Sequence, residues 1–585
     1  MFKLFKNFSK KDMMIILLCV VIMIFQVWID LKLPEYMSEI TRLIETNSSD
    51  ISPIIKPGSL MLLCAFGSMV SAIIIGYFAS GLSARFSLKL REKIFKKVGR
   101  LSTKEIKEFK TSSLITRTTN DVTQIEMLIA MGLQAMIKAP IMAIWAINKI
   151  VDKSLTLSGL VGAGVLMLLI TISIIMTVVL PKFKIIQKLT DSVNNLTREN
   201  LMGIRVIRAF NAEKFQEDRF NAVNTDLTNT HITITKTFAL LSPIMNIVMQ
   251  FLTLGIYFIG SFLIVKASMV DKINIFSNMV VFTSYGMQVI FSFLMLTMIF
   301  MILPRAQVSA KRINEVLDSS ESIQDGTVDT KKKVGTVKFN NVSFKYPDAD
   351  EYLLKNISFE AKKGEVVAFI GSTGSGKSTL INLIPRFYDA TDGEILVDGV
   401  NVKDYKLDTL HNILGYVPQK AFMFTGTVKS NIKFGSNDNK KIDDKRIEEA
   451  LEVAQGMEFV SKLDGKLDAS ISRGGTNVSG GQKQRLSIAR AIARNPEIYI
   501  FDDTFSALDY KTDANLRKAL KEYTKDATCL IVAQRIGTIM NADRIVVLDK
   551  GECVGIGTHK ELLKNCEVYK EIAYSQLSKE ELENA

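Results

Sequence analysis

Six long apolar stretches in the first half of this sequence limit what the chain can fold into. They lie at residues 13–33, 59–82, 128–150, 155–180, 238–265 and 276–303. A helix of about twenty apolar residues spans the hydrocarbon core of a bilayer. Lipid leaves no solvent partner for exposed backbone groups, which favours helices. The first half is therefore predicted to be a bundle of six transmembrane helices.

The N-terminus also resembles the start of a signal peptide, because four lysines in residues 1–12 precede an apolar stretch. No small-residue cleavage site follows that stretch, and five more apolar stretches come after it. We therefore interpret residues 13–33 as the first membrane span. The mean hydropathy of +0.19 is high for a soluble protein and agrees with this interpretation.

The formal net charge of +13 is compatible with nucleic-acid binding or with a membrane protein. The two long loops, 83–127 and 181–237, are rich in Arg and Lys, whereas the short segment 34–58 is acidic. Cytoplasmic loops of membrane proteins carry such an excess of basic residues. We predict a multi-pass protein of the cell membrane whose long loops, N-terminus and C-terminal domain are cytoplasmic. No nucleic-acid partner is expected.

The two long loops are predicted to continue the membrane helices into the cytosol, because residues 87–101 and 191–223 show helical periodicity. Short polar segments at 111–121 and 199–210 interrupt them and are candidates for docking on another surface. The second segment carries apolar side chains that need a partner, at Ile204, Val206, Ile207 and Phe210.

The composition changes at residues 318–335, which are rich in Ser, Asp, Gly and Lys and have no apolar period. We predict a membrane domain at 1–317, a linker at 318–335 and a second domain at 336–585. Strand-like and helix-like patterns alternate in the second domain, as in α/β proteins. The predicted fold class is a polytopic α-helical membrane domain followed by an α/β domain, and the glycine-rich sequence GSTGSGKST at 371–379 makes the latter a P-loop ATPase domain.

A glycine-rich motif in the second domain predicts a phosphate-binding loop. It follows the apolar stretch 366–370, precedes the helix-like stretch 380–384, and consists of Gly371, Ser372, Thr373, Gly374, Ser375, Gly376, Lys377, Ser378 and Thr379. Strand, G-x-x-x-x-G-K-[ST] and helix in this order are typical of a P-loop. Backbone N–H groups and the helix N-terminus would hold the phosphates of ATP, with Lys377 on the terminal phosphates and Ser378 on Mg²⁺.

Two further motifs refine this prediction. The apolar stretch 496–502 ends in Asp502, where a P-loop ATPase holds its Mg²⁺-directing carboxylate. A second anion-binding helix N-terminus is predicted where the helix-like stretch 483–494 begins, at Ser479, Gly480, Gly481 and Gln482. One chain has no evident use for two phosphate sites on one nucleotide, unless the second site serves another subunit.

The sequence resembles the ATP-binding cassette (ABC) exporters along essentially its whole length. The residues that carry the resemblance are GSTGSGKST at 371–379, VSGGQKQR at 478–485, IYIFDD at 498–503 and SALD at 506–509. The resemblance implies that Tyr346 stacks on adenine, that Gln419 and Asp502 join Ser378 around Mg²⁺, and that Asp509 belongs to the D-loop. It also implies a dimer in which each ATP lies between one chain's P-loop and the other's signature motif, Ser479 to Gln482.

Three positions depart from the pattern of that family, and one of them is Arg473, which replaces an acidic residue just before the signature motif. Asp503 stands where the family has the catalytic Glu, and Gln534 stands where it has the switch His. An Asp carboxylate reaches one methylene less far, and a misplacement of about 1 Å can cost on the order of 10²-fold in rate. Gln supplies no imidazole. We therefore expect the catalytic residues Asp503, Gln534 and Lys377 to form a site that binds ATP and hydrolyses it slowly.

The signature motif, in contrast, retains Ser-Gly-Gly-Gln. A homodimer would contain two slow sites, so the sequence favours a heterodimer with a second half-transporter. In this respect it resembles the degenerate-site subunit of heterodimeric bacterial multidrug exporters. The alternatives are a homodimeric lipid or peptide exporter, in which Asp and Gln suffice for hydrolysis, and an ATP-gated channel or regulator.

Polar residues within the spans are the candidates for a substrate cavity, because such residues tend to face a cavity or a neighbouring helix. They are Lys138, Asn246, Gln250, Ser284 and Gln288. Adaptable Met side chains near them would suit hydrophobic or amphipathic compounds, drug-like or lipid-like. Interhelical hydrogen bonds without substrate contact are the alternative for the Ser and Asn positions. Membrane lipids are expected neighbours of the whole bundle.

Overall fold

The computed structural model of the chain describes residues 2–6, 8–46, 51–151, 155–329, 334–434 and 442–577. These residues form two compact units. One contains residues 1–99 and 112–319, and the other contains residues 100–111 and 320–585. Each unit is described by itself.

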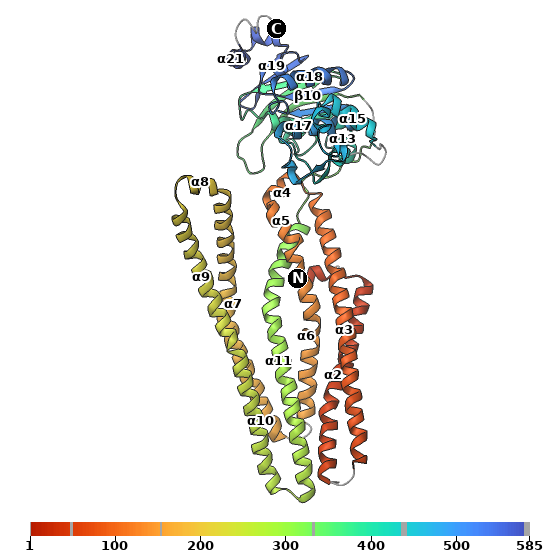
Figure 1. Cartoon of the computed structure of the whole chain (residues 1–585), viewed down its shortest axis with the longest axis vertical. Coiled ribbons are helices and arrows are strands. Elements are labelled where there is room, and N and C mark those ends of the chain that lie inside the picture. Colours follow the sequence, from red (N-terminus) through yellow and green to blue (C-terminus); the bar gives the residue numbers. More distant parts are fainter. Residues whose placement is uncertain are drawn as a thin grey trace. The chain divides into compact units, whose positions relative to one another are not determined.

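The first unit is a bundle of long helices (Figure 1). Its elements are α1 (Phe2–Phe5), α2 (Lys10–Thr46), α3 (Ser52–Val98), α5 (Thr111–Thr118), α6 (Asn120–Val151), α7 (Leu155–Met202), α8 (Ile204–Ala209), α9 (Glu213–Ala239), α10 (Leu241–Lys266) and α11 (Met269–Leu317). Within the described residues, six helical segments are long and apolar enough to cross a membrane. The six predicted spans and the predicted fold class are confirmed.

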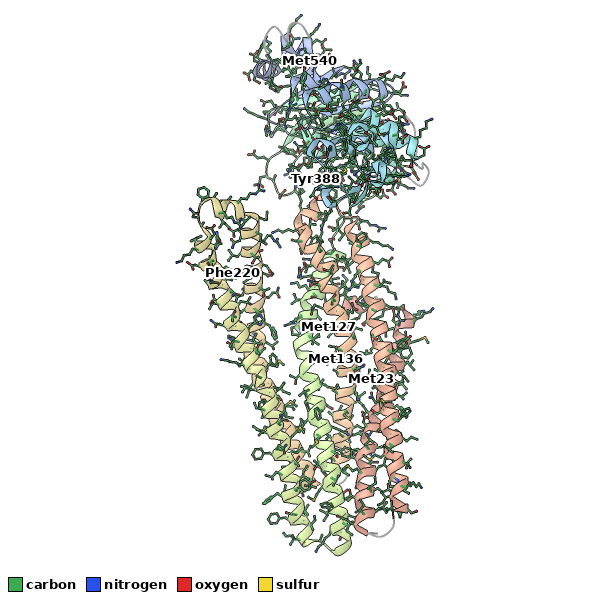
Figure 2. The ribbon with its side chains drawn as sticks, in the orientation of Figure 1. Met23, Met127, Met136, Phe220, Tyr388 and Met540 are labelled. Carbon is green, nitrogen blue, oxygen red and sulfur yellow. The ribbon has the colours of Figure 1, made fainter. Side chains whose placement is uncertain are left out.

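Helices α2, α3, α6 and α11 pack against one another in this unit. Met23 of α2, labelled in Figure 2, is fully buried with Cys19 and Ile75. A larger apolar core joins α2, α6, α7, α10 and α11 around Phe282 and Tyr285. Many other Leu, Ile and Phe side chains remain exposed on the outside of the helices. This pattern suits a bundle whose outer surface meets lipid tails.

The α7–α8–α9 segment forms a long arm in this unit. Helices α7 and α9 pack against each other, and α8 connects them at the tip. No residue of α8 is buried, and Val206 and Phe210 are 61% and 79% exposed. Of the apolar side chains that were predicted to need a partner, Ile207 is half-buried, whereas Ile204, Val206 and Phe210 remain exposed within the described part of this chain.

The described residues of the second unit form three β-sheets. A six-stranded sheet has the order β12-β11-β3-β10-β9-β6, a four-stranded sheet has the order β2-β1-β4-β5, and β7 pairs with β8. The strands are β1 (Val337–Phe344), β2 (Leu354–Ala361), β3 (Val366–Gly371), β4 (Asp392–Val397), β5 (Val400–Asn401), β6 (Leu414–Val417), β7 (Gly426–Thr427), β8 (Ser470–Ile471), β9 (Ile498–Asp502), β10 (Thr528–Val532), β11 (Arg544–Asp549) and β12 (Glu552–Gly557).

The second unit also contains helices. They are α4 (Thr103–Phe109), α12 (Lys377–Leu383), α13 (Leu407–Ile413), α14 (Val428–Lys433), α15 (Asp444–Val453), α16 (Met457–Val460), α17 (Gly480–Arg494), α18 (Tyr510–Tyr523), α19 (Ile536–Ile539), α20 (His559–Asn565) and α21 (Glu567–Gln576), with 3₁₀ turns at Lys466–Asp468 and Arg473–Gly475. Strands β6, β9, β10, β3 and β11 are parallel. In parallel α/β sheets, ligands bind beyond the carboxyl ends of the strands.

Helix α4 groups with the second unit, although it precedes α5 and α6 of the bundle in the chain. Ser102 and Glu105 form a capping box at its start. The helix ends at Lys110, whose φ of +61° is left-handed and interrupts the helix. The segment at 111–121, a candidate for docking on another surface, forms α5 and the beginning of α6. The helix that groups with the second unit is therefore α4, which precedes this segment in the chain.

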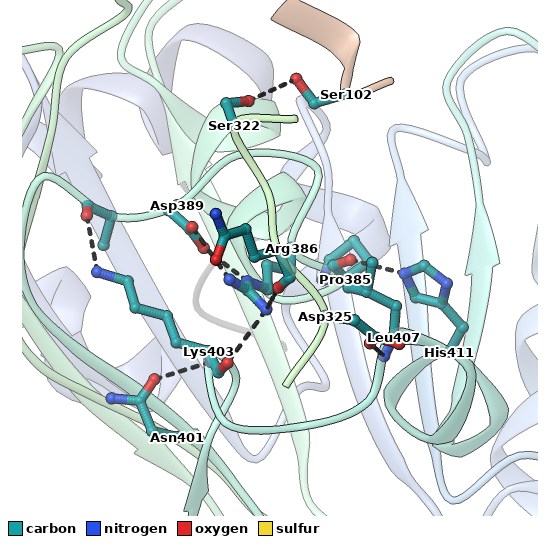
Figure 3. Close-up of polar contacts among 12 residues, drawn as sticks. Ser102, Ser322, Asp325, Pro385, Arg386, Asp389, Asn401, Lys403, Leu407 and His411 are labelled. Atoms are coloured by element: carbon teal, nitrogen blue, oxygen red, sulfur yellow. Dashed lines mark hydrogen bonds and ion pairs between the residues drawn. The ribbon is translucent and has the colours of Figure 1, made fainter. Parts of the chain in front are cut away.

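Residues 320–329 were predicted to belong to a linker, and they form hydrogen bonds with other parts of the second unit (Figure 3). The Asp325 carboxylate accepts from the Leu407 backbone N–H at 2.7 Å. The buried Arg386 donates to the Gln324 carbonyl at 2.9 Å, while Asp389 holds its guanidinium at 2.7 Å. Because these are specific contacts of a buried side chain, this stretch is an ordered part of the unit.

Candidate nucleotide site

The phosphate-binding loop predicted at 371–379 lies between β3 and α12, in the strand–turn–helix order that the sequence indicated. Gly376 precedes the helix with a φ of +93°, and a Cβ there would lie 2.6 Å from Leu354. Only glycine fits this position without a shift. Ser372, Thr373 and Gly374 form the exposed tip of the loop, where its backbone is accessible to a ligand.

Lys377 is buried inside this loop, 8% exposed. Its ammonium donates to the carbonyl oxygens of Gly371 and Ser372, each at 2.8 Å, and approaches the Ser375 hydroxyl at 3.4 Å. Burial lowers the pKa of Lys377, against the charges of Asp503 and Asp502, which raise it. The cation is therefore held within the loop by neutral carbonyls, which an anionic ligand can replace as its partner.

The end of β9 places a carboxylate beside the loop. Val532 of β10 is in register with Phe369 of β3 and with Asp502 of β9, so these three strand ends lie together. The Ser378 hydroxyl donates to Asp502 at 2.7 Å. Burial raises the pKa of Asp502, and the neighbouring charge of Asp503 raises it further. A hydroxyl and a buried carboxylate are the hard oxygen donors that Mg²⁺ prefers, so the residues fit this ion.

The next residue, Asp503, is buried in a left-handed backbone conformation with a φ of +46°. One of its carboxylate oxygens accepts two amide donors, from Gln534 at 2.9 Å and from Gln419 at 3.2 Å. The Gln534 backbone is itself held by the Gln576 amide at 2.8 Å. The structure thus brings together three residues that are far apart in the sequence. The side chains that hydrogen-bond to this carboxylate are thus two neutral amides, which donate N–H groups to it.

Tyr346 lies beside the first turn of α12, where its hydroxyl and that of Thr379 are 3.0 Å apart. Its ring is perpendicular to the rings of Phe344 and Tyr388, at centroid distances of 5.0 Å and 5.3 Å. The predicted base-stacking residue is therefore next to the phosphate loop and within an aromatic cluster. Tyr388 and Phe344 were missed by the sequence reasoning, because no motif marks them.

The signature residues form the start of α17. The Ser479 hydroxyl accepts from the Gln482 N–H at 3.3 Å, and the Gln482 side chain accepts from the Ser479 N–H at 2.9 Å. This capping box leaves the backbone of Gly480 exposed at the helix N-terminus. Asp509 caps α18 in a similar way, by accepting from the Thr512 N–H at 2.9 Å. The structure therefore contains a helix N-terminus with exposed backbone where the second anion-binding site was predicted.

In the bundle, two of the predicted cavity residues converge on Asp30 of α2. The Lys138 ammonium of α6 lies 3.1 Å from the Asp30 carboxylate, and Gln288 of α11 donates to the Asp30 carbonyl at 3.2 Å. Ser68 of α3 donates to the same carboxylate at 2.5 Å. Four helices therefore meet at one charged residue. The sequence reasoning missed Asp30, although an acid at the end of an apolar span is a recognisable signal.

The remaining predicted cavity residues lie elsewhere. Asn246 and Gln250 are exposed on α10, and Ser284 is half-buried on α11. Among the contacts of the described residues, none joins these three side chains to Asp30. Lys138 and Gln288 are therefore the only predicted cavity residues, within the described part of the chain, that share a partner.

Comparison with known proteins identifies the family. Residues 354–506 match the ABC transporter domain and residues 16–293 match the ABC transporter transmembrane region. An uncharacterized ABC transporter ATP-binding protein of Mycobacterium tuberculosis is 38% identical over 539 residues, covering 90% of both chains. An ATP-dependent lipid A-core flippase of Haemophilus influenzae is 32% identical, covering 87% of this chain and 86% of the relative.

The fold is shared with a solved structure of a bacterial Atm1-family ABC exporter with ATP bound. The TM-score is 0.82 at 22% sequence identity, and the match covers 96% of this chain and 98% of the other. The chain therefore shares the fold of that structure. The chain belongs to the ABC transporter family: it is a multi-pass membrane protein with an ATP-binding ATPase domain that drives export across the membrane.

Proposed function

We propose that this chain is one half of a heterodimeric exporter that moves hydrophobic or amphipathic compounds across the cell membrane by alternating access. In this proposal its own P-loop holds ATP and hydrolyses it slowly, while its signature motif completes a faster site on the partner subunit. The observation that carries the proposal is the contact of Asp503 with Gln534 and Gln419.

That contact bears on how water attacks the terminal phosphate. A general base must accept a proton from the attacking water at hydrogen-bond distance. The Asp503 oxygen that accepts both amides is partly occupied, and its carboxylate is one methylene shorter than that of the Glu which the family has there. Gln534 can donate to a phosphate oxygen but cannot exchange a proton at neutral pH. A site that orients the attacking water but accepts its proton inefficiently is expected to bind ATP and to hydrolyse it slowly.

The nucleotide would be held by residues of the P-loop unit. The backbone of 371–376 and the start of α12 would bind the phosphates, with Lys377 turning from its carbonyl partners to the terminal phosphates. Tyr346 would stack on the base. Ser378, Asp502 and Gln419 would hold Mg²⁺, which when bound neutralises phosphate charge and orients the terminal group.

The exposed tip of the α7–α9 arm supports a dimer. Val206 and Phe210 stand in solvent with no partner among the described residues. Exposed apolar clusters of this kind mark interaction sites. A second half-transporter would supply both the surface that covers this tip and the P-loop that faces Ser479 to Gln482. ABC exporters act as dimers, which agrees with this assembly.

The distribution of basic residues supports the proposed orientation of the chain in the membrane. The long basic loops, the N-terminus and the ATPase domain would be cytoplasmic, following the positive-inside rule. ATP is then available to the P-loop, and substrate would enter from the cytosol or the inner leaflet.

For the substrate, the bundle supports an amphipathic compound. The ion pair of Asp30 and Lys138 is a small polar group within a mostly apolar bundle. The relative from Haemophilus influenzae is named as an ATP-dependent lipid A-core flippase. A drug-like or lipid-like molecule with one polar end fits such an interior better than a small soluble ion.

The test is to purify the chain alone in lipid nanodiscs and measure its subunit number and ATPase rate. The proposal expects ATP binding with little turnover. A homodimer with robust ATPase activity that Asp503→Asn abolishes would contradict it, and would favour the homodimeric exporter. In vesicles, uphill ATP-dependent movement of a fluorescent lipid or dye supports a pump. Downhill flux with a non-hydrolysable ATP analogue would instead indicate a gated pore.

A further inference from the structure

A lysine of α4 lies on the aromatic pair of the proposed base site. The Lys107 ammonium is 5.5 Å from the centroid of the Tyr346 ring and 5.8 Å from that of Tyr388. Both distances are within the range of a cation–π interaction. The two rings are perpendicular, at an interplanar angle of 89°. Lys107 therefore sits in the corner between them.

Independent contacts hold α4 in this place. The Ser102 hydroxyl at its start lies 2.9 Å from the Ser322 hydroxyl (Figure 3). Glu105, 6% exposed, closes the capping box by accepting from the Ser102 N–H at 2.7 Å. Burial acts to raise the pKa of Glu105, but the hydrogen bonds of Ser102 and Ser322 outweigh it and lower that pKa. The helix that carries Lys107 is thus fixed to the same unit as the P-loop.

The hydrogen bonds of the two tyrosines strengthen the arrangement. The Tyr346 hydroxyl is bonded to Thr379 on α12, which orients the ring along the start of that helix. Tyr388, labelled in Figure 2, is 9% exposed, and its hydroxyl raises the pKa of Lys107 by hydrogen bonding to the charged form. Lys107 therefore stays cationic on the rings. One face of Tyr346 is occupied by this side chain.

We propose that Lys107 competes with the adenine base for Tyr346, so that ATP binding displaces α4 from the aromatic pair. The inference rests on the proposed role of Tyr346 in base stacking. An adenine ring and an ammonium both bind to the π-face of a tyrosine, and the corner between Tyr346 and Tyr388 admits one of them. Because α4 continues through the chain into α3 on one side and α5 on the other, its release would report the presence of nucleotide to the membrane helices.

The experiment compares two ligands on the full chain in lipid nanodiscs by calorimetry. One is a non-hydrolysable ATP analogue, and the other is inorganic triphosphate, which has no base. Lys107→Ala is expected to tighten binding of the analogue by about two- to five-fold, the size of one exposed cation–π contact. Binding of triphosphate should be unchanged. Lys107→Arg, which keeps the cation, should behave as the wild type.

Two control variants separate the possible failures. Lys104→Ala removes an exposed lysine of the same helix and should change neither affinity. Tyr346→Ala should weaken binding of the analogue and leave binding of triphosphate unchanged. If it does not, Tyr346 does not bind the base, and both the base site and the proposed competition are wrong. If Tyr346→Ala behaves as expected but Lys107→Ala leaves the analogue unchanged, weakens it, or alters both ligands equally, the competition alone is overturned.

Discussion

Asp502 and Asp503 are consecutive buried carboxylates with different partners. Asp502 accepts from the Ser378 hydroxyl at 2.7 Å, and Asp503 accepts from the amides of Gln534 and Gln419. Like charges so close together disfavour ionisation of both. Burial and the charge of Asp503 together raise the pKa of Asp502. A cation bound beside the two carboxylates would therefore reduce the electrostatic repulsion between them.

This arrangement predicts a pH dependence of Mg²⁺-dependent ATP binding. A protonated carboxyl is a poor Mg²⁺ ligand, so binding should be complete above the raised pKa of Asp502 and be lost as the pH falls through it. Asp503→Asn removes the neighbouring charge, lowers the pKa of Asp502 and should move the midpoint to lower pH. Calorimetric titrations across the acidic range measure this midpoint.

Asp502→Asn supplies the control for that measurement. It removes the titrating ligand, so the pH dependence that remains is that of ATP itself and can be subtracted. An unchanged midpoint in Asp503→Asn, or a midpoint that moves to higher pH, would show that the two carboxylates do not interact in this way.

At the scale of elements, α2, α3, α6 and α11 share one charged residue. The ion pair of Asp30 and Lys138, with Ser68 and Gln288 on the same aspartate, joins all four helices. A charge within an apolar bundle is tolerated only when it is paired. The pair therefore holds the helices in a defined arrangement, and in our proposal it also offers a polar group to a substrate.

Removing one partner of this pair should be costly. Lys138→Met leaves the Asp30 carboxylate without its cation and should destabilise the bundle by about 3 kcal/mol. Asp30→Asn should have a similar effect. The double variant should be less destabilised than the sum of the two, because it leaves no lone charge. Thermal unfolding in nanodiscs, followed by intrinsic fluorescence, gives the melting temperatures.

Asn246→Ala is the matched control, because Asn246 is polar, lies in a span and is exposed away from Asp30. Its melting temperature should equal that of the wild type. Strictly additive effects of the Asp30 and Lys138 substitutions would mean that the ion pair contributes nothing to the bundle.

Elements differ in how far the sequence predicts them. The P-loop was predictable because β3, the loop and α12 are consecutive in the chain and each carries a local signal. The six spans were predictable because lipid imposes a length and a composition. The contact of Asp503 with Gln534 could be anticipated only as two departures from a family pattern, since 31 positions separate them.

Other features depend on tertiary contacts that leave no local pattern. Residues 320–329 look like a linker because they are polar, yet their backbone and side chains pair with Arg386 and Leu407. Helix α4 was not separated from the membrane domain, because its assignment depends on Ser322 and Tyr388, which lie far along the chain. Lys138 was singled out as a lone charge, and only the structure supplied its partner Asp30.

For the whole molecule, the two phosphate-binding features serve different nucleotides in our account. The P-loop acts on the ATP of this chain, and the signature helix α17 acts on the ATP of the partner subunit. Ser479→Ala should therefore leave ATP binding by this chain alone unchanged. In the co-purified heterodimer it should reduce ATP turnover by about ten-fold or more, since a donor to the transferred phosphate is lost at the faster site.

Lys377→Ala is the comparison for that variant, because it should abolish ATP binding by the isolated chain. Ser479→Ala also removes the capping hydrogen bond of α17, which lowers stability by about 1 kcal/mol. Ser479→Asp keeps a cap but supplies no donor when ionised, so loss of turnover in both variants separates phosphate contact from helix stability. If Ser479→Ala weakens ATP binding by the isolated chain, the motif serves this chain's own nucleotide instead.

The most direct test of the slow-site proposal is a single-turnover measurement on ATP bound to this chain. The decay of pre-bound radiolabelled ATP is compared between the wild type and the double variant Asp503→Glu, Gln534→His, in nanodiscs with the partner subunit present and its own P-loop lysine replaced. Our account predicts slow decay in the wild type and an increase on the order of 10²-fold in the double variant, with unchanged ATP affinity. Fast decay in the wild type, or no gain in the double variant, would contradict it.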